Sequence, residues 1–157
     1  MTTTTSAAYI ALGSNLGDRR RTIEGAIAAI DALDTTTVVQ VSDLYETEAC
    51  FVEDQPDFLN ACAHLQTSLP PRDLLDTLLA IERILGRVRS LRHGPRTIDL
   101  DLLFYAHRII DEPGLSVPHP ELHKRAFVLR PLVQIAADVT HPTLKLTIAE
   151  LLAALDD

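Results

Sequence analysis

Residues 98–105 read Ile-Asp-Leu-Asp-Leu-Leu-Phe-Tyr, and this stretch is the starting point for the fold. Successive side chains of a β-strand point to opposite faces, so Asp99 and Asp101 share one face, about 6.7 Å apart along the strand. The apolar residues between and before them point to the other face. The stretch therefore predicts a strand that buries one side and presents two carboxylates on the other.

The rest of the chain supplies the partners of this strand. Asp18 is a predicted N-cap, Gly86 ends a helix that Pro70 and Pro71 open, and the polar stretch 46–57 is predicted as a loop. Hydrophobic periodicity predicts strands over 7–12, 36–41, 59–67 and 98–105, and helices over 19–32 and 71–85. Two further helices are predicted over 125–137 and from 147. The first six elements follow the order strand, helix, strand, strand, helix, strand. This order predicts an α+β, ferredoxin-like split βαβ sandwich, with an antiparallel sheet and helices packed on one main face.

Composition limits the class of protein. A length of 157 residues predicts a single domain over 1–157, with polar residues 1–6 as a disordered leader. Two cysteines without ligand spacing predict neither a disulfide framework nor a zinc site. No apolar run approaches the roughly 20 residues that span a bilayer, and no signal peptide is evident, so we expect a cytoplasmic protein without membrane contact.

The charge is acidic overall but unevenly distributed. A formal net charge of -8 argues against non-specific nucleic-acid binding. Nevertheless, five arginines fall within 14 residues immediately before the acidic strand: Arg83, Arg87, Arg89, Arg92 and Arg96. The planar guanidinium matches phosphate oxygens, and paired carboxylates suit Mg²⁺, so the combination predicts a metal-triphosphate site. The alternative is that both groups are solvated surface charges.

Two residues further along the chain have a functional and a structural interpretation. His119 lies between Pro118 and Pro120, where the imidazole either donates to a phosphate or is satisfied by a loop carbonyl. Phe127 either stacks on a ligand or belongs to the core, and its spacing alone favours the core. The residue pattern is compatible with both interpretations of each residue.

Five stretches in order resemble the hydroxymethyldihydropterin pyrophosphokinase family: YIALGSNLGD, DQPDFLNA, ERILGRVR, HGPRTIDLDLLF and LSVPHPELHKRAFVLRPL. The resemblance covers residues 9 to about 135. It implies the ferredoxin-like fold and the transfer of pyrophosphate from ATP to 6-hydroxymethyl-7,8-dihydropterin, with release of AMP, in folate biosynthesis.

The resemblance also implies roles for single residues. The residues implied in catalysis are Arg87, Arg96, Arg125, Asp99 and Asp101. Asp99 and Asp101 would bind two Mg²⁺ ions. ATP would contact Glu82, Arg87, Arg96, Ile98, His119 and Arg125. The pterin would contact Thr47, Phe58, Asn60, Asp99 and Phe127, with residues 13–15 bordering the same pocket.

The partners implied are the two small molecules, and dihydropteroate synthase as the next enzyme of the pathway. Two other functions compete with this one. A non-catalytic ferredoxin-like ligand-binding module would have no need of the acidic pair beside the arginines. Another metal-dependent phosphoryl or nucleotidyl transferase would use the same metal site without a pterin.

Overall fold

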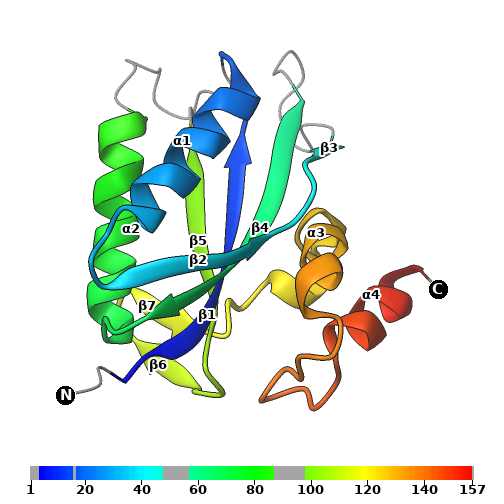
Figure 1. Ribbon diagram of the computed structural model, residues 1–157. Helices are drawn as coiled ribbons and strands as arrows, with labels where there is room; N and C mark the ends of the chain where they lie inside the picture. Colours follow the sequence, from blue (N-terminus) through cyan, green and yellow to red (C-terminus); the bar gives the residue numbers. More distant parts are fainter. Residues whose placement is uncertain (1–3, 16, 48–56, 87–97, 157) are drawn as a thin grey trace.

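An antiparallel sheet in the order β2-β4-β1-β5 forms the centre of the protein, seen here in a computed structural model that describes residues 4–15, 17–47, 57–86 and 98–156 (Figure 1). A short strand, β3, also pairs with β4. The bounds are Ser6–Ser14 for β1, Thr36–Val41 for β2, Tyr45–Thr47 for β3, Phe58–Thr67 for β4 and Asp99–Tyr105 for β5. This order, with every neighbouring pair antiparallel, confirms the ferredoxin-like α+β prediction.

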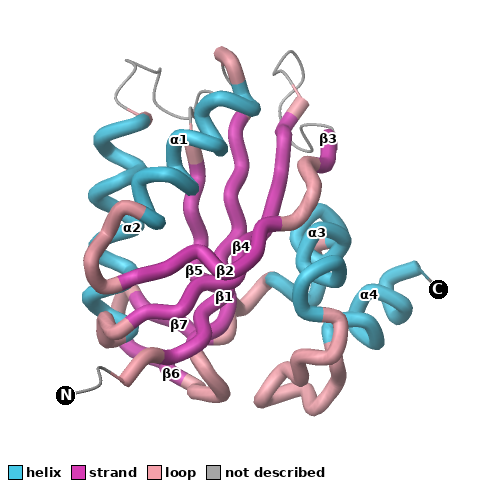
Figure 2. Tube along the Cα trace, viewed as in Figure 1, coloured by secondary structure: helices cyan, strands magenta, loops and turns pink. Residues whose placement is uncertain are grey.

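Helices cover both faces of the sheet (Figure 2). The helices α1 (Arg19–Asp31) and α2 (Pro71–Leu85) occupy the predicted main face, whereas α3 (Ala126–Ala136) and α4 (Ile148–Asp156) pack against the opposite face. The sequence predicted helices on one main face and did not assign these last two to the opposite face, because an amphipathic pattern does not indicate which face of a sheet a helix covers. The placement matters because α3 brings its N-terminal end to the site described below.

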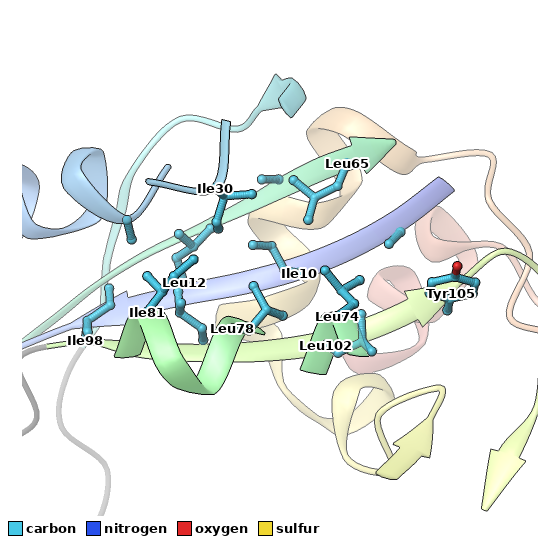
Figure 3. Close-up of a cluster of buried hydrophobic side chains, with 14 of the residues drawn as sticks. Ile10, Leu12, Ile30, Leu65, Leu74, Leu78, Ile81, Ile98, Leu102 and Tyr105 are labelled. Atoms are coloured by element: carbon cyan, nitrogen blue, oxygen red, sulfur yellow. The ribbon is translucent and has the colours of Figure 1, made fainter. Parts of the chain in front are cut away.

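Strand alternation divides the interior into two hydrophobic clusters. Ile10 and Leu12 point from β1 toward α1 and α2, where they meet Leu74 and Leu78 of α2 (Figure 3). Tyr9 and Ala11, which point to the other face of β1, pack toward α3 and α4. One strand thus stabilises two helical layers, which is the expected consequence of a two-residue side-chain period.

Most predicted elements are confirmed within a few residues. Asp18 caps α1, since its carboxylate accepts a hydrogen bond from the Arg21 backbone N–H at 3.2 Å. At the end of α2, the Gly86 N–H donates to the Glu82 carbonyl at 2.6 Å. β1 begins already at Ser6, which falls within the stretch predicted as a leader.

Two segments differ from the prediction. Glu46 and Thr47, assigned to a loop, belong to β3, whose three polar and aromatic residues lack the apolar alternation that reveals a strand. The chain after β5, for which the pattern predicted loops and no strand, forms a hairpin of β6 (Ile110–Glu112) and β7 (Leu115–Val117), with Gly114 at φ +77° in its turn. A short 3₁₀ helix, η1 (Leu122–Lys124), precedes α3.

Arg72 attaches this hairpin to the start of α2. Its guanidinium donates to the Glu112 carboxylate and to the Pro113 carbonyl oxygen, both at 3.0 Å. Because the attachment joins segments about 40 residues apart, neither segment alone indicates it.

Cys62 is a buried free thiol, and burial raises its pKa. Cys50 lies outside the described residues. Within the described ranges, no helix has the length and apolarity needed to cross a membrane.

We predict that acid destabilises the fold, in part through His141. The Nδ1 atom of this buried residue accepts hydrogen bonds from the backbone N–H groups of Thr143 and Leu144, and burial together with the nearby His123 lowers its pKa below the usual 6.5. The unfolded chain therefore takes up the proton first, so stability falls as pH decreases below about 6.5.

Urea denaturation at pH 7.5 and pH 5.0 measures this effect. His141→Asn keeps an acceptor without the titration, so its transition midpoint should fall less with pH than that of the wild type. The exposed His107→Asn is the matched control and should behave as the wild type. An equal decrease of the transition midpoint between pH 7.5 and pH 5.0 in His141→Asn and the wild type would contradict this role of His141.

Candidate functional site

The two carboxylates of β5 lie beside the smallest residues of β1. In the register of the sheet, Asp99 pairs with Gly13 and Asp101 pairs with Ala11, while Gly13 also pairs with Asn60 on its other side. Directly paired residues point to the same face of an antiparallel sheet. The carboxylates and the Asn60 amide therefore face one region, and the small side chains of β1 leave space between them.

That space is a cavity of about 170 Å³, called the first cavity from here on. A Cβ atom on Gly13 would lie 3.1 Å from the Asn60 Oδ1 atom and 3.8 Å from the Phe58 ring, so any side chain at this position would press on the Asn60 amide. The residues that line it come from β1, β3, β4, β5 and the start of α3: Ala11, Leu12, Gly13, Thr47, Phe58, Asn60, Ala61, Asp99, Asp101, Arg125, Phe127 and Val128.

Polar and aromatic groups in the first cavity are arranged for a flat, polar ring. Asn60 is 6% exposed, and its Nδ2 atom donates to the Thr47 hydroxyl at 2.7 Å. This bond fixes the orientation of the amide, which retains Oδ1 as an acceptor and a second N–H as a donor. Phe58 and Phe127 add aromatic faces, and the Arg125 guanidinium lies 5.7 Å from the centre of the Phe127 ring.

A second cavity, of about 370 Å³, lies between α2, the outer edge of β5 and the β6–β7 hairpin. Its lining residues are Leu75, Leu79, Glu82, Asp99, Leu100, Asp101, Leu102, Gly114, Leu115, Ser116, His119 and Pro120. Glu82 is held at this edge because its carboxylate accepts a hydrogen bond from the Leu100 backbone N–H at 2.8 Å.

His119 is positioned as a neutral hydrogen-bond donor. Its backbone N–H donates to the Leu103 carbonyl at 2.9 Å, and its ring Nδ1 accepts from the Glu121 backbone N–H at 3.1 Å. Burial, and secondly the charge of Arg125, lower the pKa of His119, although Glu121 and Asp99 oppose this shift. A neutral ring whose Nδ1 is an acceptor carries its proton on Nε2, which can donate to an anionic ligand.

Asp99 and Asp101 line both cavities and are the only acidic residues that do so among the described residues. Within the described ranges no group of three or more His, Cys, Asp or Glu side chains could hold a metal ion by itself. Two carboxylates suit an ion that takes its remaining oxygen ligands from a bound molecule, as Mg²⁺ does with phosphates. This geometry fits a ligand in each cavity and a cation between them.

The structure brings together most of the predicted site residues. The first cavity contains Thr47, Phe58, Asn60, Arg125 and Phe127, and the second contains Glu82 and His119. Phe127, for which spacing alone favoured the core, is partly buried: it lines the first cavity and also packs against the second hydrophobic cluster. Arg87 and Arg96 lie outside the described residues.

The ATP contact predicted for Ile98 stays a prediction, since its side chain belongs to the core. It is 2% exposed and packs in the hydrophobic cluster beneath α1 and α2, where Figure 3 shows it, and it lines neither cavity. Leu102 of β5 lines the second cavity. Ser14 and Asn15 are fully buried and, unlike Gly13, are absent from the cavity wall.

Sequence reasoning missed the apolar and hairpin residues of the second cavity, chiefly Leu75, Leu79, Leu115 and Ser116. Leu75 and Leu79 have the character of ordinary residues of an amphipathic helix. Leu115 and Ser116 follow the Pro113-Gly114 turn, and this dipeptide between two short β-prone runs is the signal that could have indicated a hairpin.

We predict that Glu82 stabilises the edge of β5 as well as lining the cavity. Glu82→Ala would leave the Leu100 N–H without this acceptor in a mostly buried position, which costs about 1–3 kcal/mol of the free energy of unfolding. Glu82→Gln keeps an acceptor for this N–H, so its free energy of unfolding should decrease less. Chemical denaturation of the three proteins measures the difference, and wild-type stability of Glu82→Ala would show that the bond is dispensable.

The relatives of the chain agree on one family. The family model described as 7,8-dihydro-6-hydroxymethylpterin-pyrophosphokinase (HPPK) matches residues 9–137. A Pseudomonas aeruginosa protein named 2-amino-4-hydroxy-6-hydroxymethyldihydropteridine pyrophosphokinase is 49% identical over 146 residues, which cover 93% of this chain and 90% of the relative. The Bacillus subtilis protein of the same name is 46% identical, with 84% of this chain and 79% of the relative covered.

Solved structures show the same fold. The wild-type HPPK-DHPS of Plasmodium falciparum matches with a TM-score of 0.76 at 15% sequence identity, over 96% of this chain and 44% of that one. The chain thus spans less than half the length of that structure. The family model and the two bacterial relatives together show that this chain belongs to the HPPK family.

Proposed function

We propose that the chain transfers pyrophosphate from ATP to 6-hydroxymethyl-7,8-dihydropterin, giving the pterin diphosphate and AMP in folate (tetrahydrofolate) biosynthesis. One observation carries the proposal beyond family membership: the carboxylates of Asp99 and Asp101 belong to the walls of two cavities at once. A transferase that joins two substrates needs such a shared boundary, whereas a module that binds one ligand does not.

The pterin occupies the first cavity in this proposal. The Asn60 amide, oriented by Thr47, can both donate to and accept from the polar edge of the pterin ring. Phe58 and Phe127 offer faces for stacking against the flat ring. The hydroxymethyl group would then lie toward Asp99 and Asp101.

ATP occupies the second cavity, with its phosphates directed to the same carboxylates. His119 donates from Nε2 to a phosphate oxygen, and Arg125, which lies at the first cavity near the boundary, supplies positive charge to the transferred group. Arg87 and Arg96 are proposed phosphate ligands from the sequence alone, since both lie outside the described residues. Glu82 lines the nucleotide side.

Asp99 and Asp101 would hold Mg²⁺, with two ions expected, through carboxylate oxygens that face one side of β5. When bound, Mg²⁺ neutralises the charge that accumulates on phosphate oxygens during transfer. The carboxylates also keep the two substrates in register, because each cavity places its ligand against the same pair of side chains.

The reaction forms one bond and breaks another. The hydroxymethyl oxygen of the pterin attacks the β-phosphorus of ATP, and the bond from that phosphorus to the bridging α-phosphate oxygen breaks, so AMP leaves. In this proposal a carboxylate at the boundary accepts the proton of the alcohol. Positioning and charge stabilisation by this chain's residues provide most of the rate enhancement in such transfers.

We further propose that residues 1–157 act as one domain in the cytoplasm and that the product passes to dihydropteroate synthase. The two hydrophobic clusters share the strands of one sheet, which supports a single folding unit. The Plasmodium falciparum structure is an HPPK-DHPS, which supports a relationship between the two enzymes.

We predict that AMP release from ATP and Mg²⁺ depends on the pterin and on the carboxylates. In the Asp99→Ala, Asp101→Ala double variant, pterin-dependent AMP formation should fall by a factor of at least about 10³. Chromatographic measurement of AMP and pyrophosphate tests this. Pyrophosphate release would indicate a nucleotidyl transferase, and a folded wild type without AMP formation would favour a ligand-binding module.

We also predict that Gly13→Ala selectively weakens pterin binding. The new methyl group would lie 3.1 Å from the Asn60 Oδ1 atom and displace the amide, at a cost of about 1–3 kcal/mol in pterin affinity. Gly25→Ala is the matched control, because a Cβ on this residue of α1 meets nothing within 4 Å. Calorimetric titration with the pterin measures both, and equal affinities for the two variants would contradict the proposed pocket.

A further inference from the structure

We infer that Arg19 is a positioning residue for the pterin, although it lies in neither cavity. The inference rests on the proposed function and adds a residue that shapes the first cavity from outside. Arg19 is the first residue of α1, and its side chain is 28% exposed.

The guanidinium of Arg19 joins two strand ends. Its Nη1 atom donates to the Glu46 carboxylate at 3.1 Å and to the Asp57 backbone carbonyl oxygen at 2.7 Å. Glu46 lies in β3 directly before Thr47, and Asp57 directly precedes Phe58, the first residue of β4. One side chain therefore holds the neighbours of two residues that line the first cavity.

The short strand β3 needs such an attachment. It has three residues, and its ladder with β4 consists of three pairs, of which the last joins Thr47 to Phe58. A strand this short is only weakly held by its own ladder, so contacts at its end determine how well it is fixed. Arg19 contributes a charge-assisted bond to a backbone carbonyl, which cannot rotate away as a side-chain acceptor can.

The position of β3 in turn determines the orientation of Asn60. The Thr47 hydroxyl accepts from the Asn60 Nδ2 atom at 2.7 Å, which decides which side of the amide presents a donor and which an acceptor. A shift of Thr47 would loosen this arrangement while leaving the second cavity intact, since none of these residues lines it. Arg19 thus acts through Thr47 and Asn60 on the pterin and not on ATP.

An exposed ion pair with no role in substrate binding would predict something different. Surface pairs contribute little, and loss of Arg19 would then leave both Michaelis constants unchanged. The two interpretations therefore separate in the kinetics of the two substrates.

The experiment compares Arg19→Ala, Arg19→Lys and Glu46→Gln with the wild type in the AMP-release assay, with KM measured for each substrate. For Arg19→Ala the pterin KM should rise about three- to tenfold, as expected for loss of a hydrogen bond to a charged group, while the ATP KM stays within about twofold. Arg19→Lys should restore part of the pterin KM, and Glu46→Gln should raise it less than Arg19→Ala does.

Two controls remove the effects of charge and of general destabilisation. Arg20→Ala deletes the same charge from the exposed neighbouring position of α1 and should leave the pterin KM unchanged. Arg72→Ala removes a comparable attachment beside the second cavity and should likewise spare the pterin KM.

A wild-type pterin KM in Arg19→Ala, or equal increases in both KM values, would overturn the inference. Either result differs from failure of the proposed function, in which the wild type itself would form no AMP from ATP and the pterin.

Discussion

The pairing register between β1 and β5 is the constraint on which the rest of the site depends. It sets Asp99 opposite Gly13 and Asp101 opposite Ala11, so that two carboxylates face two of the smallest side chains available. A shift of one residue would turn both carboxylates into the hydrophobic cluster beneath α1 and α2. Burial of Leu100 and Leu102 on that side therefore enforces the register that assembles the site.

The same register explains why one pair of side chains meets two cavities. β5 is an edge strand of the sheet, with β1 on one side and α2 and the β6–β7 hairpin beyond its other side. The first cavity opens over the small residues of β1, and the second follows the free edge, where Glu82 accepts from the Leu100 N–H. An edge strand with this pattern can bring two different ligands to one pair of carboxylates.

Local sequence pattern predicted the elements that carry their own signals. The alternation around Asp99 and Asp101 indicates a strand with both carboxylates on one face, and the Asp18 cap and Gly86 mark helix ends that the structure contains. The family motifs identified Asn60, Glu82, His119, Arg125 and Phe127, all of which line one of the two cavities.

Features that arise from contacts between distant segments were not predictable in this way. β3 is polar and depends on pairing with β4, and the hairpin is attached by Arg72 from a segment about 40 residues earlier. The alternation of side chains predicted that Ile98 faces the core, where the structure buries it. The residues of α2 that pack against it come from a separate stretch of sequence, which the alternation in β5 does not identify.

Asp99 and Asp101 are proposed to form the boundary between a pterin cavity and a nucleotide cavity. The most direct test is a crystal structure with 6-hydroxymethyl-7,8-dihydropterin, Mg²⁺ and an ATP analogue whose bridge between the α- and β-phosphates is a methylene group. We predict the pterin against Asn60, the nucleotide against Glu82 and His119, and Mg²⁺ between them on both carboxylates. Both ligands on one side of the pair, or Mg²⁺ bound away from it, would contradict the account.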